Sequence, residues 1–483
     1  MSKNKTTIGS EGIYDARVLG VPKMLILGFQ HMFAMFGATV LVPLLTGLDI
    51  ATTLLMAGLG TLFFHLVTKG KVPAFLGSSF AFLGGYGAIA PLAGANDMTQ
   101  AQLLPYACIG VAVAGLLYLV VAALIKAVGV SKVMRFFPPV VTGPIIIAIG
   151  LSLCGSAKNN CDHNWLLALL ALAIVIIFNI WGKGMAKIIP ILLGVLGACA
   201  VAAVLALLCS SPVSVIEGTQ ENPITVEYLA LFGNPKFQLF ATSAIQNVKD
   251  AAWIGLPIHW KQTVFGGVDW SNGALIVSSI IAIAPIALAT MMEHIGDISA
   301  ISSTTKRNFI EDPGLHRTLI GDGFATTFAS LFGGPANTTY GENTGVLALS
   351  KVYDPRVIRI AACFAIVLSF SPKFAAVIEL IPTAVIGGIS FILYGMISAI
   401  GIRNLIENQI DFSKSRNLII TAVILVCALS GVAIPINATA KITSRAVAAI
   451  AGIVLNIIFP SCDYVEKTEK GGDEVPKGNT YNV

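Results

Sequence analysis

The sequence predicts an all-α polytopic membrane protein with about fourteen transmembrane segments, arranged as two inverted repeats of about seven spans each. Three observations support this prediction. Of the 483 residues, 55% are hydrophobic and only 11% are charged, which is unlike an ordinary soluble domain. The apolar residues occur in runs long enough to cross a bilayer. Polar interruptions recur at matching places in the two halves of the chain.

The apolar runs define the predicted domain organisation. They begin near residues 24, 50, 72, 103, 138, 165, 188, 273, 319, 335, 357, 382, 416 and 439. We therefore expect a first repeat over residues 23–210 and a second over 273–460, separated by an extracellular or periplasmic loop over 211–272. No pattern in this loop assigns it a role.

The distribution of basic residues predicts that both ends of the chain face the cytoplasm. Cytoplasmic loops of membrane proteins accumulate Lys and Arg, and an even number of spans places most of the 30 Lys and Arg residues there. We expect a cytoplasmic N-terminal segment over 1–22 and a cytoplasmic tail over 461–483, in a multi-pass protein of the cytoplasmic membrane. This bias accounts for the net charge of +5, and no basic stretch with interleaved aromatics indicates nucleic-acid binding.

The eight cysteines lie mostly in apolar runs without metal-ligand spacing, so no metal or other cofactor is predicted. Cys154 and Cys161 flank a predicted external loop, where a disulfide and two free thiols are both compatible with the sequence. The sequence has no nucleophile with an identifiable base and no phosphate-binding loop. It therefore gives little support to a membrane enzyme.

Two polar interruptions predict broken helices. They are Gly77-Ser-Ser-Phe-Ala-Phe82 and Asn337-Thr-Thr-Tyr-Gly-Glu342, and each follows a polar helix site, Gln30-His31 or Glu293-His294. Extended backbone inside a membrane must pair its amides. We therefore expect short antiparallel strands in the third and tenth spans, with half-helix N-termini facing the gap. A kinked helix packed by Gly and Ser is the alternative for the first break.

Four acidic residues are candidates for chemistry. Glu293 and Asp297 lie at i and i+4, so a helix places both carboxylates on one face. Two neighbouring carboxylates in a low dielectric are rarely both ionised, which lets the pair carry a proton. Asp297 at the cytoplasmic rim is the alternative. Asp322 is a further candidate for proton coupling, with a helix-capping role as its alternative, and Glu342 in the second break indicates a functional site.

Two histidines lie beside these positions. His31 is compatible with a hydrogen-bonded structural role and with a role in a substrate site. His294 follows Glu293 and points about 100 degrees away from the Glu293 face of the helix.

These segments resemble the nucleobase/ascorbate transporter family, also called nucleobase:cation symporter-2. The resemblance covers residues 20 to 460 and is most specific in the second half. It rests on Glu293-His-Ile-Gly-Asp297, Asp312-Pro-Gly-Leu-His-Arg317, Asn337-Thr-Thr-Tyr-Gly-Glu-Asn-Thr-Gly345 and Val346-Leu-Ala-Leu-Ser-Lys351. Within the family, the resemblance is to the members that transport uracil.

The resemblance implies a secondary active transporter that imports uracil by proton symport and alternating access. It implies a core and a gate domain with the substrate between them, and a homodimer. The implied substrate carboxylates are those of Glu293 and Glu342. Phe80 and Tyr340 would lie on the paired extended segments, and Gly341 would donate a backbone amide.

The resemblance also assigns roles to residues around this site. His31 would support the site, and Asn343 and Gly345 match the family signature, whereas Ser350 stands where many members have Thr. One departure concerns proton coupling, because the best-known uracil symporter of the family has a histidine where this chain has Asp297. An acid pair that shares a proton keeps coupling plausible.

Hydrogen-bond chemistry narrows the choice of substrate. The two ring N–H groups of uracil can donate to carboxylates, while its carbonyl groups accept from backbone amides. Relatives that transport purines often have Gln at the position of Glu342, so the sequence favours uracil, with a xanthine or uric acid permease as the alternative. An anion exchanger of the same architecture is disfavoured because the carboxylates would repel its substrate. A passive channel fits a single acid-lined site poorly.

Overall fold

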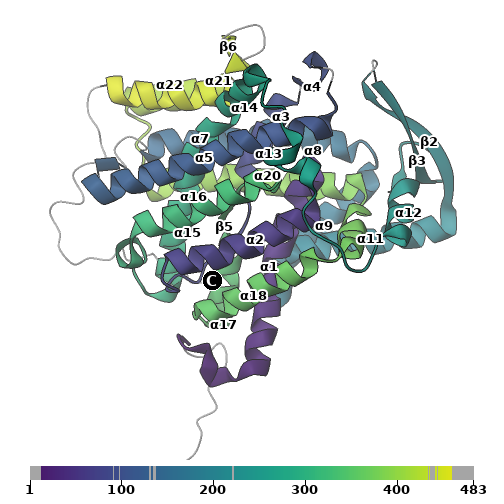
Figure 1. Ribbon diagram of the computed structural model, residues 1–483, viewed down its shortest axis with the longest axis horizontal. Helices are drawn as coiled ribbons and strands as arrows, with labels where there is room; N and C mark the ends of the chain where they lie inside the picture. Colours follow the sequence, from purple (N-terminus) through teal and green to yellow (C-terminus); the bar gives the residue numbers. More distant parts are fainter. Residues whose placement is uncertain are drawn as a thin grey trace, which may run out of the picture.

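The computed structural model describes residues 12–90, 92–96, 98–129, 132–133, 138–219, 222–432, 434–435, 441–442 and 444–459. The expected tail over 461–483 and half of the N-terminal segment expected over 1–22 lie outside these residues. The described chain is mostly helical (Figure 1).

Seven helical stretches of the described chain are long and apolar enough to cross a membrane. They are α1 (Val21–Thr46), α2 (Ile50–Val67), α5 (Gln100–Val128), α7 (Pro139–Ser152) with α8 (Cys154–Cys161), α11 (Pro190–Cys209), α14 (Gly273–Ile283) continued through η4 (Ala284–Ile286) into α15 (Ala287–Thr305), and α20 (Thr383–Glu407). An eighth candidate combines α18 (Pro355–Ser369) and α19 (Pro372–Glu379), which are bent by 88°. The protein is therefore a polytopic membrane protein.

Shorter helices fill the rest of the described chain. The apolar ones are η2 (Phe80–Phe82) with α3 (Leu83–Ile89), α9 (Trp165–Trp181), α21 (Ser415–Leu429) and the end of α22 (Ser444–Ile458). The others are η1 (Ala16–Leu19), α4 (Leu92–Ala95), α10 (Met185–Ile188), α12 (Thr242–Asp250), η3 (Trp260–Gln262), α13 (Val264–Gly267), η5 (Ile310–Gly314), α16 (Leu315–Leu331) and α17 (Gly341–Ser350). Because several helices are too short to span a bilayer unaided, the expected total of about fourteen spans stays a prediction.

Two groups of helices pack mainly among themselves. In the first group, α2 packs against α16 and α18, α16 packs against α5, and α1 packs against α18. In the second group, α20 packs against α7, α8 and α9, while α21 packs against α7 and α22. The two broken helices described below belong to the first group.

Glycines allow the close helix contacts within each group. A Cβ atom added at Gly115 of α5 would lie 2.6 Å from the carbonyl oxygen of Gly323 in α16, and one added at Gly323 would lie 2.4 Å from the Cβ of Tyr118. In the second group, a Cβ atom at Gly150 of α7 would lie 2.4 Å from the carbonyl oxygen of Tyr394 in α20. Close backbone approach at small residues is a main source of helix association in membranes.

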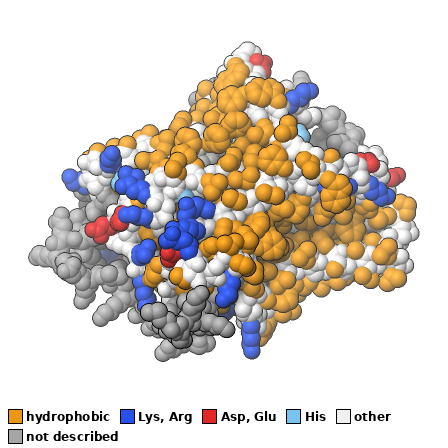
Figure 2. All heavy atoms as spheres, turned by 60° about the horizontal axis from the view of Figure 1, so that its bottom comes forward, with side chains coloured by type: hydrophobic (Ala, Val, Ile, Leu, Met, Phe, Trp, Pro, Cys, Tyr) orange, Lys and Arg blue, Asp and Glu red, His pale blue; other side chains and the backbone are white. Residues whose placement is uncertain are grey.

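The surface has the character expected of a lipid-facing protein. Figure 2 shows hydrophobic side chains over most of one face, with Lys and Arg gathered toward one side. The exposed hydrophobic residues include Leu66, Trp181 and Leu207. Soluble monomers rarely expose apolar surface on this scale.

A three-stranded antiparallel sheet corrects the expectation of an all-α chain. Its strands are β2 (Ser210–Thr219), β3 (Asn222–Leu231) and β4 (Gln238–Ala241), paired in the order β2-β3-β4. Figure 1 shows β2 and β3 beside α12 at one edge of the molecule. The sheet and α12, η3 and α13 lie in the segment over 211–272 that was expected to be a loop. A further small pair joins β6 (Ile434–Pro435) to β7 (Lys441–Ile442).

Cys154 and Cys161 are the first and last residues of α8, and both are free thiols. Cys161 is buried, and the Cys154 sulfur lies 3.7 Å from the carbonyl oxygen of Gly150 in the preceding turn. Of the two alternatives left open by the sequence, the structure has the free thiols.

Candidate functional site

The two predicted breaks meet as a short antiparallel pair within the first helix group. β1 (Leu76–Ser78) pairs with β5 (Asn337–Thr339). The ladder continues beyond the strands, because the Tyr340 N–H donates to the carbonyl oxygen of Phe75 at 3.0 Å. The predicted pairing is therefore present, and a simple kinked helix at the first break is wrong. Pairing satisfies backbone amides that would be costly to leave open inside a membrane.

Side chains of α2 and α16 hold both strands in place. The Asn337 side chain of β5 donates from Nδ2 to the backbone carbonyl oxygen of Met56 at 3.1 Å. The backbone carbonyl oxygen of Asn337 accepts from Thr326 Oγ1 at 2.7 Å. Thr61 bonds both backbone groups of Leu76 in β1, at 2.9 and 3.2 Å. Polar residues of neighbouring helices thus replace the helical hydrogen bonds that the breaks lack.

Tyr340 ties the strand pair to α1. Its hydroxyl donates to the carbonyl oxygen of Ser78 at 2.8 Å and accepts from Thr39 Oγ1 at 3.2 Å. A Cβ atom added at Gly77 would lie 2.5 Å from the Tyr340 ring, so only glycine leaves room for the ring. Tyr340 lies directly after β5, at the place the resemblance implied, and its side chain is buried.

A helix begins soon after each strand. η2 and α3 follow β1, with the half-buried Phe80 as the first residue of η2, and α17 follows β5 and begins at Gly341. Neither α3 nor α17 is capped at its N-terminus by a side chain that the structure describes. The first N–H groups of a helix have no partner within the helix, and the helix dipole makes them good ligands for electron-rich groups.

The acids of α15 lie beside the start of α17. Oδ2 of Asp297 accepts a hydrogen bond from Thr339 Oγ1 at 3.0 Å. Oδ1 of Asp297 is 3.6 Å from the position that a Cβ atom on Gly341 would take. Glu293 precedes Asp297 by one turn, and both are half-buried. Asp297 therefore contacts β5 from the middle of its helix and does not lie at a helix end.

His294 and Asp322 form a buried pair that the sequence did not predict. Nδ1 of His294 in α15 lies 3.1 Å from Oδ2 of Asp322 in α16, and both side chains are fully buried. Asp322 is in the middle of α16, so the helix-capping alternative is wrong. His294 points away from the Glu293 face of α15 and toward α16. The signal that could have revealed the pair is that a buried carboxylate needs a partner.

α17 is joined to α1 through the family signature. Asn343 Nδ2 lies 3.1 Å from the carbonyl oxygen of His31 and 3.2 Å from His31 Nδ1, and both side chains are buried. Gly341 and Gly345 are exposed one turn apart on α17, and a Cβ atom at Gly345 would meet nothing within 4 Å. This face of α17 therefore borders open space. Glu342 is the second residue of α17, and its side chain lies outside what the structure describes.

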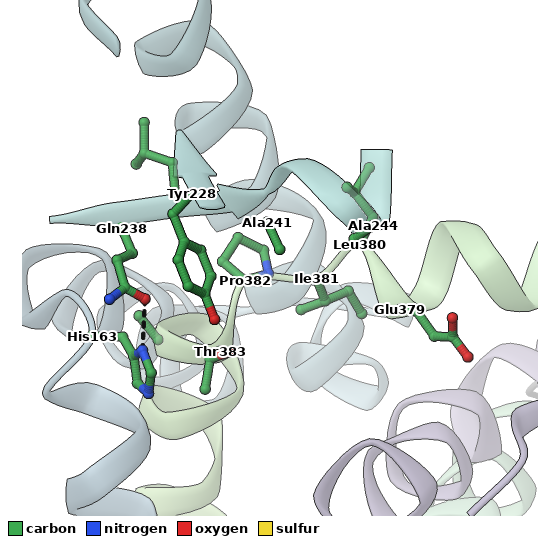
Figure 3. Close-up of a pocket in the computed structure, with 12 residues that line it drawn as sticks. His163, Tyr228, Gln238, Ala241, Ala244, Glu379, Leu380, Ile381, Pro382 and Thr383 are labelled. Atoms are coloured by element: carbon green, nitrogen blue, oxygen red, sulfur yellow. Dashed lines mark hydrogen bonds between the residues drawn. The ribbon is translucent and has the colours of Figure 1, made fainter. Parts of the chain in front are cut away.

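A separate hollow lies between the three-stranded sheet and the start of α20. It encloses about 380 Å³, partly open to solvent, and its lining includes His163, Tyr228, Gln238, Glu379 and Thr383. In Figure 3 the Glu379 carboxylate points away from His163, whose Nδ1 lies 2.7 Å from the Gln238 side-chain oxygen. The lining contains none of the predicted site residues. The hollow is therefore distinct from the site at the broken helices.

Two broken helices meet inside one of the two helix groups, next to acidic side chains. This arrangement is typical of membrane transporters. The chain belongs to the permease family, whose sequence model matches residues 22–437. The family resemblance of the sequence is thereby confirmed, and the protein is a transport protein and not an enzyme.

Several relatives are similar over nearly their whole length. The uracil permease of Bacillus caldolyticus is 40% identical over 91% of this chain and 93% of its own length. The uracil permease of Bacillus subtilis is 37% identical over 95% and 97%, and that of Escherichia coli K12 is 35% identical over 90% of each chain.

Solved structures of transporters share the fold. The transmembrane domain of the cyanobacterial bicarbonate transporter BicA matches with a TM-score of 0.59 at 16% identity, over 92% of this chain and 99% of that chain. SLC26A9 matches with a TM-score of 0.61 at 11% identity, over 92% and 66%. At these identities the likeness concerns the fold alone.

Proposed function

We propose that this chain imports uracil across the cytoplasmic membrane by proton symport with alternating access. The observation that carries the proposal is the β1–β5 pair, which ends at the start of α17 beside the acids of α15. The substrate is supported by relatives named uracil permease at 35% to 40% identity. A site at paired half-helices of one helix group suits a transporter that moves this group against the other.

Uracil fits the chemistry of this site. Its two ring N–H groups donate to the carboxylates of Glu293 and Glu342. Its carbonyl groups accept from the first backbone N–H groups after the strands, at Gly341 and Phe80, where the helix dipoles favour electron-rich atoms. His31 supports the site through Asn343.

Proton coupling resides in the acids next to the substrate. Glu293 and Asp297 lie one turn apart on α15, and Asp297 contacts β5 directly. Loading a proton on this pair outside and losing it inside drives uptake in the direction of the proton gradient. Asp322 is the third coupling acid.

The proposed architecture is about fourteen spans in two inverted repeats over 23–210 and 273–460. The equivalent order of strand and helix in β1–η2–α3 and β5–α17 supports it. The first helix group is the core and the second is the gate, and a homodimer forms through the gate. The Lys and Arg distribution supports cytoplasmic termini.

The fold also admits two rivals. A xanthine or uric acid permease of the same family is disfavoured by the carboxylate of Glu342, which only accepts hydrogen bonds when ionised. An anion exchanger is disfavoured because Glu293 and Asp297 would repel an anion at the start of α17.

Binding competition on the purified protein tests the substrate. Unlabelled uracil should displace radiolabelled uracil, while xanthine, sulfate and bicarbonate should not. Glu342→Gln should weaken uracil binding by about tenfold or more, since a hydrogen bond to a charged group is worth about 1.5 to 3 kcal/mol. Displacement by xanthine would reassign the chain as a purine permease, and displacement by sulfate or bicarbonate would reassign it as an anion exchanger.

A further inference from the structure

We infer that Asp297, Thr339, His294 and Asp322 form a buried proton relay that connects the substrate site with α16, with His294 as the residue that passes the proton on. This inference rests on the proposed proton symport and specifies its route. Thr339 and His294 have no role in the proposal above, and their side chains supply the two links between the coupling acids.

The relay is defined by three successive contacts. Thr339 Oγ1 donates to Asp297 Oδ2 at 3.0 Å and lies 3.4 Å from His294 Nδ1. His294 Nδ1 in turn lies 3.1 Å from Asp322 Oδ2. Asp297 and His294 both lie on α15, where Thr339 of β5 connects their side chains, and His294 makes the contact with Asp322 of α16. Proton transfer proceeds between heavy atoms about 2.6 to 3.2 Å apart. The contacts of Asp297 and Asp322 have this spacing, and the Thr339–His294 contact at 3.4 Å must shorten for transfer.

Two glycines beside Asp322 isolate the inner half of the relay. A Cβ atom at Gly321 would lie 2.7 Å from the Phe64 ring, and one at Gly323 would lie 2.4 Å from the Tyr118 Cβ. The Phe64 ring also faces the His294 ring edge-on, with centroids 6.3 Å apart. His294 and Asp322 are both fully buried behind these aromatic side chains. A proton on Asp322 therefore exchanges through His294 and not directly with solvent.

Protein atoms of the described chain use only part of the hydrogen-bonding capacity of this pair. Within the described chain, His294 is the one polar contact of the Asp322 carboxylate, and Nε2 of His294 has no hydrogen-bond partner. Buried carboxylates in structural pairs normally have their remaining lone pairs satisfied. A buried carboxylate with few hydrogen-bond partners beside a histidine is suited to exchange of a proton.

Other titratable groups around the relay lie on α2, α5 and α15. Glu293 precedes His294 on α15, and the Tyr118 hydroxyl of α5 donates to Thr290 Oγ1 at 2.5 Å, within electrostatic reach of Glu293 and Asp322. On α2, His65 Nε2 contacts the carbonyl oxygen of Ala74 at 2.9 Å. Thr339 contacts both Asp297 and His294.

The proton balance of the relay is simple. The relay starts with His294 protonated on Nε2 alone and with Asp322 as a carboxylate. Protonated Asp297 gives its proton to the Thr339 oxygen, and the Thr339 hydroxyl proton passes to the free Nδ1 of His294. The imidazolium then gives the Nδ1 proton to Asp322. One proton has moved from Asp297 to Asp322, Thr339 and His294 are restored, and no electrons are transferred.

Matched variants in proteoliposomes test the relay. Thr339→Val keeps the shape but removes the hydroxyl, and Thr339→Ser keeps the hydroxyl. His294→Asn keeps a polar group near the Nδ1 position but cannot carry a proton. Ser299→Ala is the control, because Ser299 is exposed on α15 and its hydroxyl donates to the Ile295 carbonyl oxygen of its own helix. The readouts are the proton entry per uracil, followed with a pH-sensitive dye, and uracil counterflow.

The relay predicts that Thr339→Val and His294→Asn lower the number of protons entering per uracil by about tenfold or more, while counterflow stays measurable. Thr339→Ser and Ser299→Ala should match the unmodified protein. A normal proton-to-uracil ratio in Thr339→Val overturns the relay and leaves symport intact. If Thr339→Val does not fold, a normal ratio in His294→Asn overturns it instead. Absence of proton entry in the unmodified protein defeats the proposed symport itself.

Discussion

The hydroxyl oxygen of Thr339 lies 3.0 Å from Oδ2 of Asp297, so β5 is hydrogen-bonded to the acidic side of α15. The same residue pairs with Leu76 of β1. Two strands of three residues each therefore connect both broken helices to the acids. Changes to the strand pair should consequently affect stability and substrate binding together.

Gly77→Ala should destabilise the protein and weaken uracil binding. The new Cβ atom would lie 2.5 Å from the Tyr340 ring and 2.6 Å from Thr39 Oγ1, and the hydrogen bonds of Tyr340 prevent its ring from moving aside. Overpacking of this kind costs about 1 to 3 kcal/mol. Thermal unfolding in detergent measures the loss. Gly155→Ala is the control, since its Cβ atom meets nothing within 4 Å, and equal unfolding temperatures for both variants would contradict the prediction.

Tyr340→Phe should lower the free energy of unfolding by about 1 to 3 kcal/mol, because it leaves the buried carbonyl oxygen of Ser78 without its donor. Tyr14→Phe is a suitable comparison. The Tyr14 hydroxyl also donates to a carbonyl oxygen, that of Thr305, but Tyr14 is 40% exposed and water can replace the lost bond. Denaturation of both variants in the same detergent measures the two losses in the free energy of unfolding. A loss for Tyr340→Phe no larger than that for Tyr14→Phe would disprove the anchoring role of the Tyr340 hydroxyl.

His31 and Asn343 should be energetically coupled. A cycle of His31→Ala, Asn343→Ala and the double variant should give a coupling free energy of about 0.5 to 3 kcal/mol for uracil binding, since residues in direct contact are not additive. Isothermal titration with uracil measures each corner of the cycle. Additive effects would mean that the α1–α17 contact does not support the site.

Asp15 of the N-terminal segment accepts a hydrogen bond from the Arg356 guanidinium of α18 at 2.8 Å, and this attachment should persist over a wide pH range. The Arg17 guanidinium, hydrogen-bonded to Asp15, holds the pKa of that carboxyl well below its usual range. Because the folded-state pKa is depressed, the stabilising contribution is present above the unfolded pKa of about 3.9 and is lost as the pH falls below it. The unfolding temperature of Asp15→Asn should therefore differ from that of the unmodified protein by the same amount at pH 7 and pH 5. A difference that disappears already between pH 7 and pH 5 would contradict this assignment.

The strand pair could be predicted because polar, glycine-containing segments interrupt apolar runs in both halves, and extended backbone in a membrane must find a partner. The position of Glu293 and Asp297 followed from helical spacing alone. The His294–Asp322 pair was missed because spacing on one helix does not reveal which neighbouring helix each face meets.

The three-stranded sheet was missed for a different reason. Residues Val213, Val215, Val226 and Tyr228 alternate as in β-strands, but the segment lies between the two expected repeats, where the apolar runs predict only a connection. The number of spans could not be settled either, since broken and short helices lack the length of an ordinary span.

Uptake of radiolabelled uracil into proteoliposomes, with and without an inward proton gradient, tests the central proposal most directly. The unmodified protein should accumulate uracil only when the gradient is present, and Glu293→Gln should lose this gradient-driven accumulation. Uptake that ignores the gradient, or a Glu293→Gln variant whose uptake depends fully on it, would contradict proton symport through the acids of α15.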